Sequence, residues 1–437
     1  MHRLTTLIRE DMVPALGVTE PGAIAFAAAK ARSLARGALR HLTVSMNSGL
    51  YKNAYSCGIP GADEVGAVYA AALGYIAGDP AKELETLSGI TKQDLETARR
   101  LVAAGLVTAE MTGISSRIAL KARLETDQDT AEVEIRDRHT RIVSIAVNGR
   151  EQRPDTAGQS VKAEDEEEGQ LIRQMTLGGI LSYVRTVPAE EIGFIRDAFR
   201  VNLELFEEGL KSERTPFIRH LLKQNGGVLF SRDKRKTASL LCNGAIEARV
   251  TGLNKPAMSI TGSGAHGIMA TLPLYAVWKI RNLPKEALLR ATALSFLICM
   301  YIKAYSGRLS ALCGCALAGG TGAACGLCLM GGGDEAAIGR VISNMASCLT
   351  GMICDGGNQG CVMKGIAACD AAFAAAELAL DGVCVDSVHG INGFTPEETM
   401  QNIGRIASPG MTETERTIVE IQAEKAVRSS ESPAARQ

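Results

Sequence analysis

The cysteines in one stretch of this 437-residue chain carry its clearest chemical pattern. Cys313 lies in the segment LSALCGC, and Cys354 and Cys361 flank the segment DGGNQG. Thiolates are soft ligands that select iron–sulfur clusters, zinc or copper(I). A cubane iron–sulfur cluster is normally held by four cysteines, so three protein thiolates would leave one iron open to a substrate. Judged on these residues alone, a structural zinc ion explains the pattern equally well.

Other cysteines compete for the same role. The rivals in this part of the chain are Cys315, Cys325, Cys328, Cys348 and Cys369. Cys325 and Cys328 have the C-x-x-C spacing of metal and redox sites. They lie inside an uninterrupted Ala/Gly-rich helical pattern, which favours buried, small apolar side chains instead. The remaining cysteines are expected in the core: Cys57, Cys242, Cys299 and Cys384.

A glycine-rich segment, TGSGAHG at residues 261–267, is the second candidate site. Its glycines expose backbone amides that can bind an anion such as a substrate carboxylate. Ser263 and Gly264 are therefore predicted to bind substrate, and His266 to act as an acid or base. A histidine in a loop is also commonly just solvated. The spacing of the glycines does not match the dinucleotide fingerprint, so nucleotide binding is disfavoured.

Two further turns offer polar groups. Thr19 is a candidate N-cap, and a helix N-terminus can receive a substrate carboxylate. Glu20 is a candidate general base, because enclosure can raise the pKa of a carboxyl group into a useful range. A favourable charge at a helix start explains Glu20 equally simply. Asn47 follows a predicted strand at residues 41–46, where either a substrate-binding loop or a solvated loop is expected.

Four motifs occur in an order that resembles a known family along nearly the whole chain. They are PALGVTEP, PAMSITGSGAHGIMATLP, LSALC and GMICDG. The chain resembles the L-cysteine desulfidase family, the UPF0597 group, which is related to the alpha chain of iron–sulfur L-serine dehydratase. The resemblance implies that Cys313, Cys354 and Cys361 hold a [4Fe-4S] cluster and that TGSGAHG forms part of the substrate pocket. It also implies a lyase that converts L-cysteine into pyruvate, ammonia and sulfide, or alternatively acts on L-serine.

The chain departs from this family at two places. Val18 stands where relatives carry a cysteine in the motif GCTEP, and Ala265-His266 stands where relatives usually carry two polar amide residues. Valine can neither ionise nor bind iron. A non-catalytic, cluster-binding paralogue is therefore a further alternative. If the protein is catalytic, Glu20 and His266 are the candidates to replace the missing base.

The composition excludes some classes of function. A formal net charge of −1 and an aromatic content of 4% disfavour binding to nucleic acid or to an anionic membrane. No apolar signal segment is recognised near the first residue, so we expect a cytoplasmic protein. Residues 309–333 carry no charge and are long enough to span a bilayer, but they are only weakly apolar. We expect no membrane, a small amino-acid substrate and, as an open option, a homo-oligomer.

These patterns predict an α+β fold in three segments. Residues 1–110 form a helical segment with one strand and the GVTEP turn, and residues 111–165 form a small antiparallel β-meander followed by an acidic linker at 151–169. Residues 166–437 form a helical, cluster-binding domain. The meander strands are expected at residues 118–124, 130–135 and 142–147. Helices are expected at 4–16 (ended near Val13 by Pro14), 22–36, 64–78, 91–104, 178–187, 189–211, 216–224, 291–305, 309–330, 335–350, 362–380 and 413–428.

Overall fold

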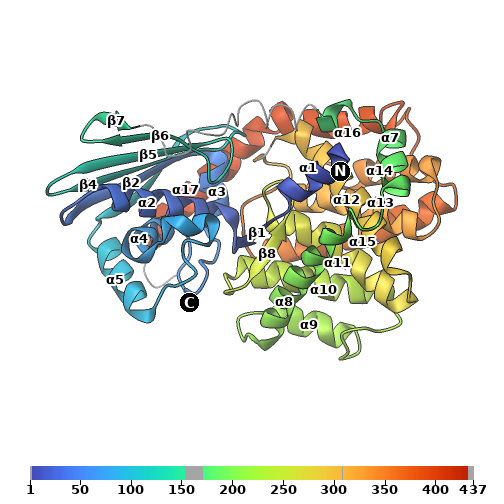
Figure 1. Ribbon diagram of the computed structural model, residues 1–437, viewed down its shortest axis with the longest axis horizontal. Coiled ribbons are helices and arrows are strands. Elements are labelled where there is room, and N and C mark those ends of the chain that lie inside the picture. Colours follow the sequence, from blue (N-terminus) through green and yellow to red (C-terminus); the bar gives the residue numbers. More distant parts are fainter. Residues whose placement is uncertain (1, 153–170, 308, 432–437) are drawn as a thin grey trace.

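The computed structural model describes residues 2–152, 171–307 and 309–431. They form a lobe that contains a β-sheet and a larger helical lobe beside it (Figure 1). Each lobe has its own apolar core. The predicted α+β class, with mainly helical content, is confirmed.

The sheet lobe is built on six strands in the order β3-β2-β4-β5-β6-β7. β2 and β3 run parallel, and the other neighbours are antiparallel. In β4, Leu120, Ala122 and Leu124 alternate with more exposed residues, so they bury one face of the sheet under the helix α2. The strands are β2 (Leu39–Asn47), β3 (Val107–Gly113), β4 (Ala119–Thr126), β5 (Thr130–Arg136), β6 (Ile142–Val147) and β7 (Arg150–Gln152).

Three helices cover this face of the sheet (Figure 1). They are α2 (Thr19–Leu34), α4 (Ala67–Ala77) and α5 (Lys92–Ala103). α2 and α4 cross closely because Gly74 lacks a side chain: a Cβ there would lie 2.3 Å from the carbonyl oxygen of Ala25. α5 begins at a capping box between Thr91 and Asp94. This close packing fixes the N-terminus of α2 at the boundary between the lobes.

Four helices, α10 to α13, form the centre of the helical lobe, and their side chains are buried on nearly all faces. Its helices are α1 (Arg3–Asp11), α7 (Leu177–Thr186), α8 (Arg196–Lys211), α9 (Pro216–Gln224), α10 (Lys234–Val250), α11 (Gly264–Arg281), α12 (Lys285–Ser306), α13 (Gly320–Met330), α14 (Glu335–Leu349), α15 (Gly360–Leu380) and α16 (Pro396–Arg405). Among the described helices, α12 alone is long and apolar enough to cross a bilayer, and most of it is buried inside this lobe.

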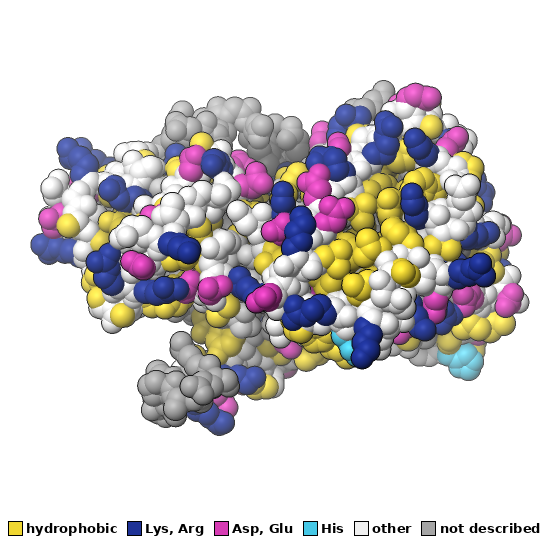
Figure 2. Space-filling view, turned by 90° about the horizontal axis from the view of Figure 1, so that it is seen from below, with side chains coloured by type: hydrophobic (Ala, Val, Ile, Leu, Met, Phe, Trp, Pro, Cys, Tyr) yellow, Lys and Arg dark blue, Asp and Glu magenta, His cyan; other side chains and the backbone are white. Residues whose placement is uncertain are grey.

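The C-terminal helix connects the two lobes. α17 (Thr412–Glu431) leaves the helical lobe and packs against α3 (Ser48–Ala54) of the sheet lobe (Figure 1). Between them Lys52 Nζ lies 2.7 Å from Glu415 Oε2, and both side chains are buried. Charged side chains of both signs are interspersed over the face in Figure 2, in keeping with the small net charge.

Several predicted elements differ from the observed ones. The first helix ends at Asp11, because residues 13–16 form a strand, β1 (Val13–Leu16), that pairs with β8 (Pro256–Ser259). The predicted helix at 309–330 is wrong in its first part, where Leu312 instead forms an antiparallel bridge with Ile353. A π-helical turn at Cys315–Gly319 then leads into α13. The strands β3 and β8 and the helices α10, α11 and α16 were not predicted.

The predicted segment boundaries at residues 110 and 165 remain predictions. The sheet takes β2 from the first predicted segment and β4 to β7 from the second, and β3 crosses the boundary between them. Most of the predicted acidic linker, residues 153–169, lies outside the described part of the chain.

Candidate active site

One cavity of about 90 Å³ between the lobes gathers most of the predicted site residues. Its lining includes Val18, Glu20, Ser263, His266, Cys313, Cys354 and Cys361. Thr19, Asn47 and Gly264 are not part of the lining. Residues far apart in the sequence therefore meet here, from the start of α2, the start of α11, and the segments on either side of the Leu312–Ile353 bridge.

That bridge sets the relation between two of the cysteines. The Cys313 amide donates to the Met352 carbonyl at 2.8 Å, and the Cys354 amide donates to the Ala311 carbonyl at 2.6 Å. Cys313 and Cys354 are therefore diagonal neighbours on the same face of a short antiparallel ladder. Such neighbours have Cα atoms roughly 7–8 Å apart. Both side chains therefore lie on one face of the ladder, and both line the cavity.

Cys361 brings a third thiol from the first turn of α15. Its amide donates to the Asn358 carbonyl at 3.0 Å, and its thiol donates to the Gly356 carbonyl at 3.4 Å. Burial, with the charges of Cys354 and Cys361, raises the pKa of the Cys313 thiol to about 12. Burial, with the charge of Cys354, also raises the pKa of Cys361. Three buried thiolates would repel one another unless a cationic group lay between them.

No three His, Cys, Asp or Glu side chains in the described part of the chain are close enough together to hold a single metal ion. Of the rival cysteines, Cys315 also lines the cavity, and its thiol donates to the Ala265 carbonyl at 3.3 Å. Cys325 and Cys328 lie in α13 and do not line it. Both were expected to be buried, small apolar side chains, and both lie in the apolar core of the helical lobe.

Glu20 is a buried carboxylate held by two partners. Asn53 Nδ2 donates to its Oε1 at 2.9 Å, and His139 Nε2 lies 3.6 Å from the same oxygen. Burial alone would raise the pKa of Glu20, but the hydrogen bonds and charges of His139, Asn53 and Arg249 outweigh burial and lower it to about 2. The expected upward shift is therefore wrong. At neutral pH Glu20 is a fixed negative charge in the cavity wall.

His266 lies in the first turn of α11 and not in a loop as predicted. Its Nδ1 lies 2.6 Å from Thr261 Oγ1, and that hydroxyl donates to the Ile260 carbonyl at 2.7 Å. The hydroxyl therefore accepts from Nδ1–H, which assigns the lone pair to Nε2. Burial, followed by the charges of Lys303 and Arg249, holds the pKa of His266 well below its usual value. The imidazole is neutral.

The free nitrogen of His266 is directed at the segment that carries Cys313. A Cβ placed on Gly314 would lie 2.6 Å from His266 Nε2, so the glycine allows the ring to approach. Thr261 holds the ring from a strained position, because its φ of 54° is uncommon for a β-branched residue. The Thr261 amide donates to Asp11 Oδ2 at 2.6 Å, which ties this turn to α1.

Of the remaining predicted residues, Ser263 lines the cavity, whereas Thr19 and Asn47 do not. Ser263 is the N-cap of α11, lines the cavity and makes no side-chain cap bond. Thr19 Oγ1 donates to the Gly262 carbonyl at 3.2 Å, so Thr19 joins the starts of α2 and α11. Asn47 lies outside the cavity. Its Nδ2 donates to the Ser115 carbonyl, and its Oδ1 accepts from the Ala119 amide.

The cavity also contains polar residues that the sequence analysis missed. They are Asn53, His139, Arg249 and Lys303. None belongs to a recognisable motif, although Asn53 follows soon after the strand whose end was predicted to bind substrate. Val18 faces the loop that carries two of the cysteines, because a Cβ on Gly357 would lie 3.0 Å from its methyl groups.

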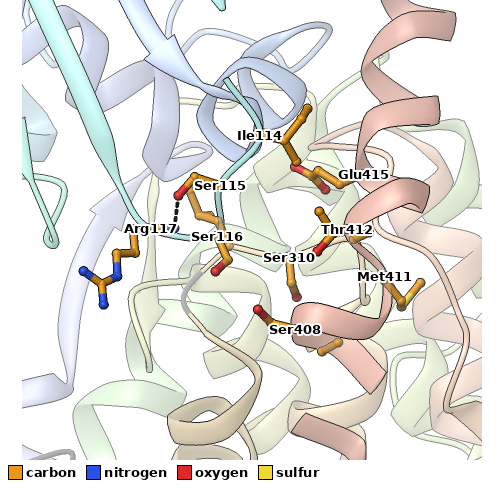
Figure 3. Close-up of a pocket in the computed structure, with 12 residues that line it drawn as sticks. Ile114, Ser115, Ser116, Arg117, Ser310, Ser408, Met411, Thr412 and Glu415 are labelled. Carbon is orange, nitrogen blue, oxygen red and sulfur yellow. Dashed lines mark hydrogen bonds between the residues drawn. The ribbon is translucent and has the colours of Figure 1, made fainter. Parts of the chain in front are cut away.

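A second, larger pocket of about 240 Å³ adjoins this cavity (Figure 3). Figure 3 shows Thr412 and Glu415 of α17 on one side of it, and Ser115 and Ser116 from the loop before β4 on the other. Ser310 lines both pockets. Because the second pocket contains none of the predicted site residues, the smaller cavity is the candidate active site.

Comparison with known proteins shows the family of this chain. The chain matches the serine dehydratase alpha chain family over residues 81–420. It is 38% identical over 427 residues to a UPF0597 protein of Clostridium botulinum (strain Okra / Type B1), covering 96% of this chain and 98% of the relative. It is 34% identical over 427 residues to a UPF0597 protein of Caldanaerobacter subterraneus subsp. tengcongensis, covering 97% and 98%. The chain belongs to the serine dehydratase alpha chain family, as its motifs predicted.

Proposed function

We propose that the protein is a cytoplasmic, [4Fe-4S]-dependent lyase that removes the β-substituent of a small L-amino acid. L-cysteine is the favoured substrate, giving pyruvate, ammonia and sulfide. The observation that carries this proposal is that Cys313, Cys354 and Cys361 line the same cavity as His266 and Ser263. A lyase is also the activity that membership of the serine dehydratase alpha chain family suggests.

The three thiols fit an iron–sulfur cluster better than a zinc ion. A zinc site needs every donor at about 2.0–2.3 Å from one ion, whereas each thiolate of a cubane binds a different iron atom. The diagonal relation of Cys313 and Cys354 keeps the two thiols apart, as separate iron atoms require. When bound, the cluster supplies a Lewis acid that stabilises the negative charge developing on the leaving group.

The chain itself supplies the proton transfer. His266 lines the cavity with Nε2 unprotonated, so it is the proposed base for the α-proton, whereas the Glu20 carboxylate is held by Asn53 and His139. Ser263 and the amides at the start of α11 orient the substrate, because a helix N-terminus attracts a carboxylate. Loss of the α-proton and the β-substituent leaves an enamine, which hydrolyses to pyruvate and ammonia.

An anaerobic assay tests this proposal. The purified protein is incubated with L-cysteine and with L-serine, and sulfide and pyruvate are measured, with D-cysteine as the control. Pyruvate and sulfide from L-cysteine alone support the desulfidase activity, and pyruvate from L-serine supports a serine dehydratase. If iron-loaded protein produces pyruvate from neither, the proposed activity is wrong.

One observation favours a second candidate, a cluster-binding paralogue without lyase activity. Val18 places an aliphatic side chain against Gly357, where the resemblance implies a thiol. Iron and zinc analysis of the anaerobically purified protein separates both candidates from a zinc protein. Its colour gives the same distinction, because a cluster protein is brown and a zinc protein is colourless. In either case the expected partner is a small amino acid, and a homo-oligomer remains a proposal.

A further inference from the structure

Arg249 is a buried cation that the proposed chemistry has not yet used. It is the second-last residue of α10, is 5% exposed and lines the active-site cavity. Its Nε has no hydrogen-bond partner within the described part of the chain. The Glu20 carboxylate feels its charge but is itself held by Asn53 and His139. Burying a guanidinium N–H without a hydrogen-bond acceptor is costly, so such a group points to a ligand that is bound during function.

The charge of Arg249 acts on groups all around the cavity. It contributes to lowering the pKa of both Glu20 and His266. It also opposes the upward shifts of the pKa of Cys315 and Cys361. The guanidinium is therefore within electrostatic reach of all four of these residues.

The local packing sets the guanidinium against the start of α11. A Cβ on Gly264 would lie 2.7 Å from Arg249 Nε and 2.8 Å from the Ala257 Cβ. Gly264 therefore leaves the space in which the guanidinium lies. The neighbouring Ser263 hydroxyl lines the cavity, and the first amides of α11 have no partner within the helix. A guanidinium, a hydroxyl and a helix N-terminus together form a site for a planar anion.

We propose that Arg249 binds the α-carboxylate of the substrate and makes the cavity selective for amino acids over analogues that lack the carboxylate. This inference rests on the proposed function and adds the recognition residue to it. Ser263 and Gly264 lie just before His266 in the chain, so a carboxylate at Arg249 places the adjacent α-carbon near His266 Nε2. Recognition and proton abstraction then use neighbouring parts of one helix start.

Direct binding measurements test this inference independently of turnover. Calorimetry on the anaerobic, iron-loaded protein compares L-alanine, which has no β-substituent to lose, with L-alaninamide, which keeps the ammonium group but lacks the carboxylate. Arg249→Gln should weaken L-alanine binding by roughly 10–100-fold, the loss expected for a charge-assisted hydrogen bond, and leave L-alaninamide binding unchanged. Arg249→Lys keeps the charge without the bidentate fork, so its loss should be intermediate.

The other outcomes contradict the inference in distinguishable ways. Equal weakening of both compounds would show that Arg249 shapes the cavity without recognising the carboxylate. Loss of iron or of the folded circular dichroism spectrum in both variants would show that Arg249 supports the cluster or the fold. If the parent binds L-alanine without converting L-serine or L-cysteine, the proposed lyase activity fails while the carboxylate site stands. A parent that binds no amino acid overturns both.

Discussion

Thr261 Oγ1 lies 2.6 Å from His266 Nδ1, and this contact decides which ring nitrogen faces the cavity. The same hydroxyl donates to the Ile260 carbonyl at 2.7 Å, which assigns it as the acceptor of the ring Nδ1–H. Thr261 is thus a positioning residue: it touches no substrate in the proposed mechanism but fixes the tautomer and orientation of the proposed base.

Thr261→Val should lower kcat for pyruvate formation and leave KM nearly unchanged. Valine keeps the β-branched shape, so the backbone at φ 54° is strained to the same degree as in the parent. The ring loses its acceptor and the Nε2 base is no longer fixed. General base catalysis contributes about 10²–10⁴-fold, which bounds the loss. Thr261→Ser should restore most of the rate, and an equally slow Ser variant would contradict the role of the hydroxyl.

Cluster loading provides the second prediction. Replacing Cys313, Cys354 or Cys361 by Ser should lower the iron content per chain and bleach the visible absorbance of the anaerobically purified protein. Cys325→Ser and Cys328→Ser are the matched controls, because these residues lie in α13 away from the cavity. Iron loss in the two controls with full iron in Cys354→Ser would show that the ligands lie elsewhere.

Six of the nine predicted site residues line the cavity, whereas Thr19, Asn47 and Gly264 do not. Ser263, His266 and the three cysteines come together although the chain segments that carry them are far apart. Properties that depend on partners distant in sequence could not be predicted. The low pKa of Glu20 arises from His139 and Asn53, and neither has a signal in the sequence.

The helix wrongly expected from residue 309 has a similar cause. Residues 309–314 are uncharged and mostly apolar, which fits a buried helix or a buried extended segment equally well. The bridge between Leu312 and Ile353 decides for the extended form, and it is set by a segment far along the chain. Arg249 shows the same limit, because its role depends on the space left by Gly264.

The buried pair between the lobes gives a prediction about stability. Glu415→Gln leaves the Lys52 ammonium buried beside a neutral group, since Lys52 and Glu415 are 1% and 6% exposed. Breaking a buried pair in this way typically costs about 3–5 kcal/mol of unfolding free energy. Glu413→Gln on the same helix removes an exposed pair with Arg416 and should cost less than about 1 kcal/mol. Thermal or urea unfolding of both variants measures the difference, and equal losses would contradict it.

Glu20 should make the stability of the metal-free protein depend on acidity. Its pKa is about 2 in the folded chain against an ordinary 4.5. A lowered pKa contributes stability that is fully present above pH 4.5 and is lost as the pH falls towards 2. The shift corresponds to about 3 kcal/mol. Urea unfolding between pH 6 and pH 3 should therefore show a smaller loss of stability for Glu20→Gln than for the parent; parallel curves would mean that Glu20 is not held as a buried anion.

Val18→Cys should increase sulfide release from L-cysteine under anaerobic conditions. Val18 precedes the first turn of α2, is 2% exposed and packs against Gly357, between Cys354 and Cys361 in the chain. Cysteine is smaller than valine, so it fits this position without displacing the loop, and it adds an ionisable thiol beside the proposed cluster. Val18→Ala is the matched control, because it creates similar space without a thiol. A gain in Val18→Cys alone, by as much as about 10²-fold, would show that the missing thiol limits turnover. An unchanged rate in protein that retains its iron would show that His266 already performs the proton transfer and that this chain no longer needs the thiol.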